Sequence, residues 1–485
     1  MKTLLLSITH GFQARDLLRT EVFRMLRAAR VRLVIATPNF RDEYFVKEFG
    51  GPGVLLEPLD MSVSRTERQM ATFRRYVLAS FKLNSTINAL NERFHKSRSP
   101  RYVSVRALNA VFGRMPVLQQ LYMRLEAALF PGKQYDSLFE RYRPDLLVTG
   151  TPGSIPADAH LLRCARRFGV RSACVVLSWD NLTSKGHMAA DPDELIVWNR
   201  IMKQEAQELH RYPADRVHVA GVSHFDVYAW PSRAGTREQF CRSFGLDPSR
   251  AIITFGTVTP WLFPHNADIA EILAQANAAD RFVRPAQLVV RLHPQVMNSG
   301  TQHSENINRY RRIAADYPHV RLDLPAVRSD SLMWDVAESD MLHLADLLRY
   351  SDVTLNAGST LSIDSAIVDT PIVNIGFDGY ATVPPEQSVR RIHDFTHYAN
   401  LVRTGGVRIA HSAEEMVRLI NDYLVDRSRD RAGRARIVDE QCFRIDGQSG
   451  RRVGTLLLSM MDVAAPSVPL PAASSLDATD VVARR

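Results

Sequence analysis

The stretch from Asp352 to Gly379, DVTLNAGSTLSIDSAIVDTPIVNIGFDG, decides the fold of this chain. Its apolar run 353–355 is typical of a buried strand, the small residues 356–360 form a turn, and a helical pattern follows. Pro371 ends the helix, and the β-branched run 372–377 is typical of a second strand. Two strands this close, with a helix between them, predict a parallel pair joined by a right-handed crossover.

The turn within this stretch is also a candidate ligand site. Ser359 and Thr360, next to Gly358, lie where the predicted helix begins. Backbone N–H groups and the helix dipole favour an anion such as a phosphate at this position. The alternative interpretation is an ordinary Ser/Thr cap on an ordinary helix.

Length and composition indicate a globular protein of two or three domains, because 485 residues are too many for one core. Hydrophobic residues make up 45% of the chain, and no apolar run approaches the roughly 20 residues of a membrane span. The apolar run 1–8 is too short for a signal peptide and predicts the first buried strand. The four cysteines lack CxxC spacing, so the sequence predicts no disulfide framework or structural zinc and favours a reducing cytoplasm.

Positive charge is concentrated between Arg65 and Arg143. This segment holds 15 Lys/Arg and 5 Asp/Glu, a net +10, whereas the whole chain has +9. Its aromatic and aliphatic residues recur at helical spacings, which predicts a helical insertion with basic faces. Such helices are either a solvated insertion or a surface for an anionic membrane or a polyanionic acceptor. Nucleic acid is not expected as a partner, because no binding motif accompanies the charge.

Strand and helix patterns alternate along the chain in two blocks, separated by a loop that contains Pro231 and Gly235. This order predicts an α/β protein with two doubly wound, Rossmann-like domains that face a cleft, in which ligands bind beyond the carboxyl ends of the strands. The expected parts are a first domain over 1–228 with the basic insertion over 65–143, a second domain over 237–440, a helix over 441–463 that can return to the first domain, and a disordered tail over 464–485.

Three motifs carry a resemblance to a known family. They are Arg291-Leu292-His293-Pro294 at a predicted strand end, the turn and helix 356–364, and Ser178-Trp179-Asp180-Asn181 with the polar residues that follow. With these motifs in this order, the chain resembles GT-B glycosyltransferases of bacterial surface-carbohydrate synthesis and the related CDP-glycerol and polyol-phosphate transferases. The resemblance covers most of residues 1–460. It implies an acceptor-binding first domain and a second domain that binds a nucleotide-activated donor.

On the donor side, the resemblance implies that His293, Ser359 and Thr360 hold the diphosphate. A protonated His293 beside Arg291 would stabilise the charge on a departing nucleotide, although an ion pair is the alternative for the arginine. Asp364 is expected to accept hydrogen bonds from the ribose hydroxyls. Asn356 stands where many retaining members carry a glutamate, so retaining chemistry is not indicated. The full set of expected donor contacts is Gly256, Thr257, Arg291, His293, Asn356, Gly358, Ser359, Thr360 and Asp364.

On the acceptor side, inverting members often place a base in the loop after the first strand, and His10 occupies that loop. An imidazole with an ordinary pKa near 6.5 suits deprotonation of a hydroxyl. Asp180 is the rival base, with a turn residue as its alternative role. His293 completes the expected catalytic set, and three further residues are expected to border the same cleft: Lys185, His187 and Thr151.

No metal and no intrinsic cofactor are expected. Asp191-Pro192-Asp193 resembles a manganese motif of another glycosyltransferase fold, but its proline and its place before a strand indicate a turn. The expected function is metal-independent transfer of a sugar from a nucleotide-sugar to a cell-envelope glycan or lipid-linked acceptor, in the cytoplasm or at the inner face of the membrane. The alternatives are transfer of glycerol or ribitol phosphate from a CDP-linked donor, a non-catalytic polymer-binding or scaffolding protein, and a nucleotide-sugar 2-epimerase.

Overall fold

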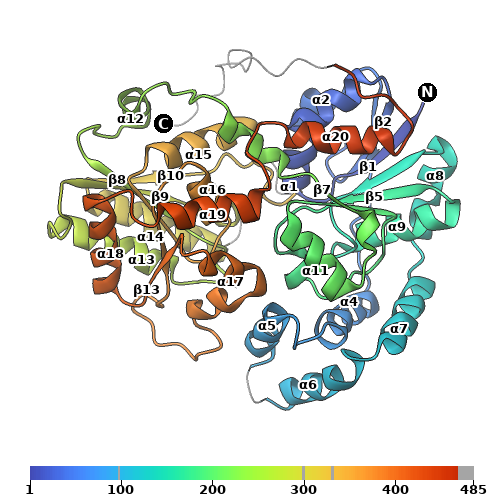
Figure 1. Cartoon of the computed structure of the whole chain (residues 1–485), viewed down its shortest axis with the longest axis horizontal. Helices are drawn as coiled ribbons and strands as arrows, with labels where there is room; N and C mark the ends of the chain where they lie inside the picture. The colour runs from blue at the N-terminus through green and yellow to red at the C-terminus, as the bar shows by residue number, and fades with distance from the viewer. Residues whose placement is uncertain (97–98, 298–300, 329–331, 468–485) are drawn as a thin grey trace.

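The structure is a computed structural model, and it describes residues 1–96, 99–297, 301–328 and 332–467 (Figure 1). It contains two β-sheets, with strand orders β3-β2-β1-β4-β5-β6-β7 and β10-β9-β8-β11-β12-β13. All ladders within the two sheets are parallel. The strand order reverses beside β1 and beside β8, which places a ligand crevice beyond the carboxyl ends of these strands. The predicted pair of doubly wound, Rossmann-like sheets is confirmed.

The strands agree with the sequence pattern to within two residues at most ends. Those of the first sheet are β1 (Thr3–Ser7), β2 (Arg32–Thr37), β3 (Val54–Pro58), β4 (Leu146–Thr149), β5 (Arg171–Val175), β6 (Glu194–Val197) and β7 (Val217–Val219). Those of the second sheet are β8 (Ala251–Gly256), β9 (Ala286–Arg291), β10 (Val320–Asp323), β11 (Val353–Asn356), β12 (Ile372–Ile375) and β13 (Arg408–Ala410). The pattern does not predict β13, because this three-residue edge strand is only partly buried.

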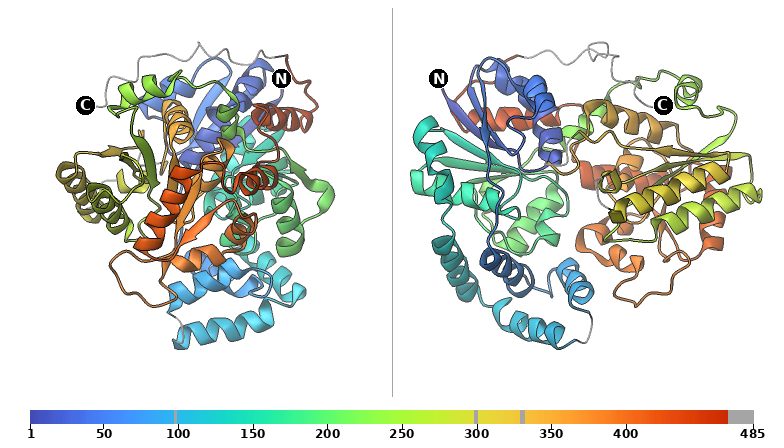
Figure 2. Two further views of the ribbon diagram at one scale, coloured as in Figure 1. Left: turned by 60° about the vertical axis from the view of Figure 1, so that its left-hand side comes forward. Right: turned by 180° about the vertical axis from the view of Figure 1, so that it is seen from behind.

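Helices cover both faces of each sheet (Figures 1 and 2). Around the first sheet they are α1 (Gly11–Gln13), η1 (Ala14–Leu18), α2 (Glu21–Ala28), α3 (Glu43–Phe49), α9 (Pro156–Phe168), α10 (Asn181–Ser184), α11 (Arg200–His210), η4 (Ala214–Arg216) and η5 (Ser223–Ala229). Around the second they are α12 (Arg237–Phe244), α13 (Asn266–Ala278), η6 (Pro294–Met297), α14 (Thr301–Asp316), α15 (Glu338–Tyr350), α16 (Leu361–Ile367), η7 (Val389–Asp394), α17 (Thr396–Arg403) and α18 (Ala413–Val425).

One predicted helix is interrupted. The pattern predicts a single helix over 15–29, but the structure has the π-helical turn η1, a break, and then α2. Thr20 produces the break, because its hydroxyl accepts the N–H of Val22 at 3.4 Å and donates to the carbonyl of Asp16 at 2.8 Å. The π-helical turn has no simple sequence signature.

Between β3 and β4 the chain forms a separate group of helices at the edge of the molecule (Figure 1). They are α4 (Arg65–Phe73), η2 (Arg74–Leu78), α5 (Ser85–His95), α6 (Pro100–Phe112), α7 (Pro116–Leu129), η3 (Lys133–Tyr135) and α8 (Asp136–Tyr142). Helix α5 contacts the second half of the molecule, because Arg391 pairs with Glu92 at 2.6 Å and Arg93 donates to a carbonyl of the loop after β8.

The last two helices pack on different halves of the molecule. Helix α19 (Arg431–Cys442) lies against α16 in the second half, whereas α20 (Ser449–Ser459) crosses back and packs on α2 (Figure 1). Val453 and Leu457 of α20 are buried in the same core as Met25. Residues 468–485 of the expected disordered tail lie outside the described residues.

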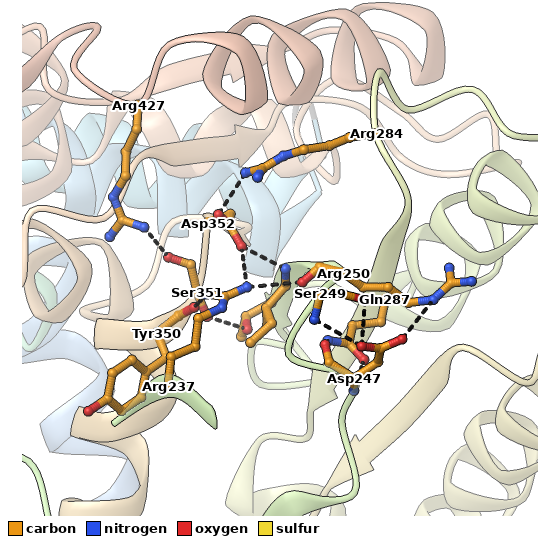
Figure 3. Close-up of polar contacts among 12 residues, drawn as sticks. Arg237, Asp247, Ser249, Arg250, Arg284, Gln287, Tyr350, Ser351, Asp352 and Arg427 are labelled. Atoms are coloured by element: carbon orange, nitrogen blue, oxygen red, sulfur yellow. Dashed lines mark hydrogen bonds and ion pairs between the residues drawn. The ribbon is translucent and has the colours of Figure 1, made fainter. Parts of the chain in front are cut away.

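Asp352 is the first residue of the stretch quoted above and directly precedes β11. It therefore lies at the amino ends of the strands, whereas the turn 356–360 lies at their carboxyl ends. Figure 3 shows its carboxylate between Arg237 and Arg284, at 2.9 and 2.7 Å. It also accepts the N–H of Ile252 at 2.8 Å, which links β11 to β8. The charged start of the stretch is therefore a structural tie, and the ligand site lies at the other end of the strand.

Candidate functional site

The side chain of Asn356 stabilises the turn after β11 through hydrogen bonds to its backbone. This side chain is fully buried, and its Oδ1 accepts the N–H groups of Gly358 and Ser359 at 3.0 and 2.9 Å. Gly358 has φ +85°, and a Cβ there would come within 2.5 Å of Ile392. Asn356 and Gly358 therefore shape the turn. Neither residue lines the cavity above it, in contrast to the expected donor contacts at these two positions.

A cavity of about 180 Å³ lies between the two halves, at the carboxyl ends of the strands. It brings together seven of the nine expected donor residues: Gly256, Thr257, Arg291, His293, Ser359, Thr360 and Asp364. Phe12, Arg15 and Tyr228 line it from the opposite side. Ligand pockets typically measure roughly 300–1,000 Å³, so a nucleotide-sugar needs more room than this conformation offers. We refer to this space as the donor cavity.

Two hydrogen bonds position His293. Its backbone N–H donates to the hydroxyl of Thr257 at 2.8 Å, and its Nδ1 accepts the N–H of Gln295 at 3.1 Å. Burial lowers the pKa of His293 to about 4. A neutral ring that accepts at Nδ1 carries its proton on Nε2. Without a bound anion, the low pKa of His293 favours a neutral ring that offers one hydrogen-bond donor, the Nε2–H.

Arg291 is neutralised by two carboxylates. Its Nη1 lies 2.5 Å from Asp323 and its Nη2 lies 2.5 Å from Asp340. Burial alone would lower the pKa of Arg291, but these two carboxylates raise it above its ordinary value. The structure favours the ion pair over direct phosphate binding at this position.

Asp364 connects the two halves. Tyr228, on η5, donates its hydroxyl proton to Asp364 Oδ1 at 2.6 Å. Burial raises the pKa of Asp364 above its ordinary value, although the hydrogen bond from Tyr228 opposes this shift. One carboxylate oxygen is thus already in use, and only the other remains for the expected ribose contact.

Arg15 is a site residue that the sequence pattern does not reveal. Its Nε lies 2.6 Å from Asp16, its guanidinium lies 4.4 Å from the Phe12 ring centroid, and it lines the donor cavity. Its two Nη groups have no hydrogen-bond partner among the residues that the structure describes. Arg15 lies in the π-helical turn η1, which directs its side chain to this position. The amphipathic sequence pattern predicts a regular helix here and does not indicate this orientation.

His10 caps α1 at the end of β1. Its Nδ1 accepts the N–H of Phe12 at 3.1 Å, so Nε2 carries the proton of the neutral ring. Burial, together with the charges of Arg15 and Lys185, lowers the pKa of His10 to about 4. In this conformation His10 is a hydrogen-bond donor at Nε2, which argues against the expected role as a base.

Trp334 separates His10 from His293. Its indole lies edge-on to both imidazoles, with ring centroids 5.0 Å from that of His10 and 5.2 Å from that of His293. Met333 and Trp334 both have positive φ, +41° and +62°, a strained pair of backbone conformations for residues with side chains. The segment 332–335 reaches from the second half into the first, and nothing in its sequence indicates this insertion.

Two contacts hold this segment in place. Asp335 is fully buried, lies 2.5 Å from Arg19, and accepts the hydroxyl proton of Tyr44 at 2.6 Å. The N–H of Gly11 donates to the Leu332 carbonyl, and a Cβ on Gly11 would come within 2.3 Å of Asp335. Glycine is therefore required after His10, because the backbone of Asp335 approaches this closely.

Asp180 lies at the start of α10, and its carboxylate is ionised. Ser178 donates to Oδ1 at 2.6 Å and Ser184 to Oδ2 at 2.5 Å. Burial alone would raise the pKa of Asp180, but Lys185, His397 and the two hydroxyls outweigh burial and hold it well below its ordinary value. This carboxylate is ready to accept a proton, although only weakly basic.

Lys185, Thr151 and His187, which are expected to border the cleft near Asp180, lie in different surroundings. Lys185 lies 3.9 Å from the Asp180 carboxylate and borders a second cavity. Thr151 is buried and donates to Asp158 at 2.8 Å, and His187 lies against Met188 and His210. Thr151 and His187 line neither cavity, and Asp180 adjoins the second one only through Lys185.

The second cavity measures about 500 Å³ and is basic and aromatic. It lies between η2, α5, the loop that contains Lys185 and the loop after β8. Its lining includes Arg75, Arg93 and Lys185 together with Tyr76, Phe94 and Trp261. We refer to this space as the basic cavity. Lys185 is common to it and to the surroundings of Asp180, so the basic cavity adjoins the candidate base.

The described ranges hold neither a metal-binding cluster nor a membrane-spanning helix. No group of three or more His, Cys, Asp and Glu side chains with metal-binding geometry occurs there. Asp193 accepts the N–H and hydroxyl of Ser172, in agreement with a turn at 191–193. Within the same ranges, none of the helices combines the length and apolarity needed to cross a bilayer.

Comparison with known proteins gives the fold. No protein-family model matches the chain, and no curated protein sequence matches it. The solved structures that are similar to it include a putative UDP-N-acetylglucosamine 2-epimerase from Listeria monocytogenes (TM-score 0.54, 10% identity, covering 95% of this chain and 97% of that chain), the S. aureus MnaA–UDP co-structure (0.53, 10%, 96% and 98%), and the Methanocaldococcus jannaschii UDP-GlcNAc 2-epimerase in complex with UDP-GlcNAc and UDP (0.51, 11%, 95% and 100%). At such low identity the similarity establishes the architecture alone, and the chain has the GT-B fold.

Proposed function

We propose that the protein transfers a sugar from a nucleotide-sugar to a cell-envelope glycan or lipid-linked acceptor. One observation carries this proposal: Thr257, His293, Ser359 and Thr360 meet Arg15 around a cavity at the carboxyl ends of a GT-B fold. Two of the similar structures hold UDP, and one also holds UDP-GlcNAc. Since one fold hosts many functions, the chemistry of the cavity has to distinguish among them.

The donor cavity is suited to a diphosphate. Ser359 and Thr360 offer hydroxyls, His293 offers its Nε2–H, and Arg15 offers Nη groups that have no hydrogen-bond partner among the described residues. Each of these groups can donate a hydrogen bond to a phosphate. Such donors stabilise the negative charge that develops on a departing nucleoside diphosphate, and charged donors do so most strongly. We propose that these side chains, rather than a bound cation, balance that charge.

The basic cavity is the proposed acceptor site. Arg75, Arg93 and Lys185 suit an acceptor that carries a phosphate or carboxylate, and the aromatic faces of Tyr76 and Trp261 offer apolar contact to sugar rings. Asp180, next to Lys185, is the proposed base because it is ionised, whereas His10 presents a protonated Nε2. The protein would then act in the cytoplasm.

A second candidate is a nucleotide-sugar 2-epimerase, because two of the similar structures are a UDP-GlcNAc 2-epimerase and a putative one. An epimerase needs no separate acceptor site, and the basic cavity therefore favours transfer. Glycerol or ribitol phosphate transfer from a CDP-linked donor remains a further alternative, distinguished by attack at phosphorus and release of CMP. A non-catalytic scaffold would release no nucleotide at all.

The test combines binding and turnover. Thermal unfolding is measured with UDP, GDP, CDP, CMP and TDP, and the stabilising nucleotide selects the activated donors for turnover assays. Transfer predicts that one nucleoside diphosphate raises the melting temperature and that the matching donor releases it, faster when acceptor is present. Release of CMP would identify the polyol-phosphate alternative, and a changed sugar without nucleotide release the epimerase. If no nucleotide stabilises the fold, the transferase proposal fails.

A further inference from the structure

Helix α7 has its polar and apolar faces reversed. Gln119 and Glu126 point into the protein and are buried, whereas Val117, Leu121 and Leu125 are 73%, 61% and 51% exposed. A surface helix of a globular protein normally does the opposite and buries its apolar stripe. The exposed residues recur every four positions, so they share one face of the helix.

Hydrogen bonds fix this orientation. Gln119 donates to the carbonyl of Leu78 at 2.9 Å and accepts from Arg211 at 2.6 Å. Glu126 is paired with Arg74 and with Arg163, the latter at 3.2 Å. Rotating the helix to bury its leucines would leave these groups unpaired, which is costly. The outward apolar face is therefore a built feature of the protein.

Helix α6 repeats the arrangement. Asn109 is buried, and its side-chain amide donates to three backbone carbonyls of the segment 76–79. On α6, Val103, Leu108 and Val111 again face outward, whereas Tyr102 is buried and Val105 packs against the core. Together the two helices and their connection hold eight of the twenty exposed large hydrophobic residues among those described, namely Val103, Leu108, Val111, Met115, Val117, Leu121, Leu125 and Leu129. We refer to these eight as the apolar face.

Positive charge surrounds the apolar face. Arg101 and Arg106 on α6, Arg124 on α7 and Arg114 in the connection between them are all exposed. Glu126 is the only acidic residue in the sequence between positions 99 and 130, and it is buried. Figures 1 and 2 show both helices at the edge of the molecule, away from the two sheets. The exposed surface is thus apolar and cationic, without acidic side chains.

We propose that the apolar face binds the surface of an anionic phospholipid bilayer, with α6 and α7 lying in the plane of the interface. Leucine and valine would enter the acyl boundary, and the four arginines would contact lipid phosphates, as in interfacial amphipathic helices. A second copy is disfavoured because a two-fold contact through this face would bring the arginines of both copies together without carboxylates. An acidic protein would match the positive charge of the arginines, but it would offer the eight apolar side chains less apolar area than a bilayer does.

The proposal stands independently of the proposed transferase activity. It does have a consequence for that activity, because Arg74 lines the basic cavity and pairs with Glu126 on α7. The cavity and the apolar face are therefore linked through a single ion pair. A lipid-linked acceptor held in the bilayer would enter the protein close to the cavity proposed to receive it.

The test is co-sedimentation of the full chain with vesicles. The wild-type protein is expected to bind vesicles of phosphatidylcholine with phosphatidylglycerol, and to bind pure phosphatidylcholine vesicles much less. Leu121→Ser with Leu125→Ser should reduce binding at least about tenfold, because each serine removes an exposed apolar side chain from the interface. Val425→Ser is the matched control, since Val425 is 70% exposed on the distant helix α18.

A second variant separates charge from apolar contact. Arg114→Gln with Arg124→Gln should weaken binding to the anionic vesicles and reduce its dependence on salt. Unchanged thermal unfolding of the variants verifies their fold. The proposal is overturned if the wild-type protein does not bind anionic vesicles, or if the leucine variant binds as well as wild type. A dimer in sedimentation velocity that the leucine variant dissociates would instead assign the face to self-association.

Discussion

Tyr228 and Asp364 are joined by a hydrogen bond of 2.6 Å that crosses the donor cavity from one half of the molecule to the other. Both residues are buried, and burial raises the pKa of each. The bond therefore has two effects: it holds the halves together, and it keeps one oxygen of Asp364 occupied. A ligand that contacts Asp364 must use the remaining oxygen or displace Tyr228.

Removing the Tyr228 hydroxyl tests this link. Tyr228→Phe leaves a buried carboxyl oxygen without its donor, so we expect the free energy of unfolding to fall by about 1–3 kcal/mol. Urea denaturation measures the change. The control is Tyr350→Phe, because Tyr350 donates an exposed hydrogen bond to Gly235 and should alter stability by less than about 0.5 kcal/mol. Equal effects of the two substitutions would contradict the prediction.

Arg15 is the strongest candidate for binding the donor phosphates. Arg15→Gln removes a charged donor whose Nη groups have no partner among the described residues, and we expect nucleotide affinity to fall about 10- to 100-fold. Titration calorimetry with the nucleotide identified by thermal unfolding gives the value. Arg41→Gln is the control, since Arg41 is exposed outside both cavities. An Arg15 variant with full affinity would remove this residue from the donor site.

Asp335 is expected to contribute strongly to stability. The Arg19–Asp335 pair is almost completely buried and connects the two halves. Asp335→Asn leaves a buried arginine partly uncompensated, which should cost about 3–5 kcal/mol. Glu48 still contacts Arg19 in this variant and moderates the loss. The exposed pair Arg391–Asp394 supplies the control, because Asp394→Asn should change the free energy of unfolding by at most about 1 kcal/mol.

Acid should destabilise the protein through its buried histidines. The pKa of His293 is about 4 in the folded state and near 6.5 when unfolded, so between these values the unfolded chain binds more protons. Stability is therefore full above pH 6.5 and falls as the pH drops towards 4. His293 alone accounts for up to about 3 kcal/mol of this loss. In urea denaturation as a function of pH, His293→Gln should reduce the slope in this window, and an unchanged slope would contradict the assignment.

The fold was accessible from sequence because its signals are local. The apolar runs of β8, β9 and β11 are continuous, as buried parallel strands require, and turns and helix starts separate them. The edge strand β13 lacks that continuity and escapes prediction. The break at Thr20 escapes as well, because the buried residues Leu18, Val22 and Met25 keep the spacing of a single amphipathic helix across it.

The candidate site was only partly accessible, because its remaining members depend on contacts between distant segments. Ser359 and His293 follow strands, where the sequence indicates ligand residues. Arg15 and Trp334 gain their positions from a helical irregularity and from an insertion between the halves. The charge of Arg291 also looks available in the sequence, but two aspartates from other elements compensate it.

Asp180 and His10 are the two candidates for the base at the acceptor side, and substitutions distinguish between them. Asp180→Asn keeps the size of the side chain but removes the charge that accepts a proton, so we expect turnover to fall about 10²- to 10⁴-fold with nucleotide affinity unchanged. His10→Gln keeps a donor near the Nε2 position and should reduce turnover much less. Ser184→Ala, which removes one hydrogen bond to Asp180, tests position against charge: it should raise the pKa of Asp180 and shift the acidic limb of the rate profile to higher pH. If His10→Gln abolishes turnover while Asp180→Asn does not, the assignments are reversed.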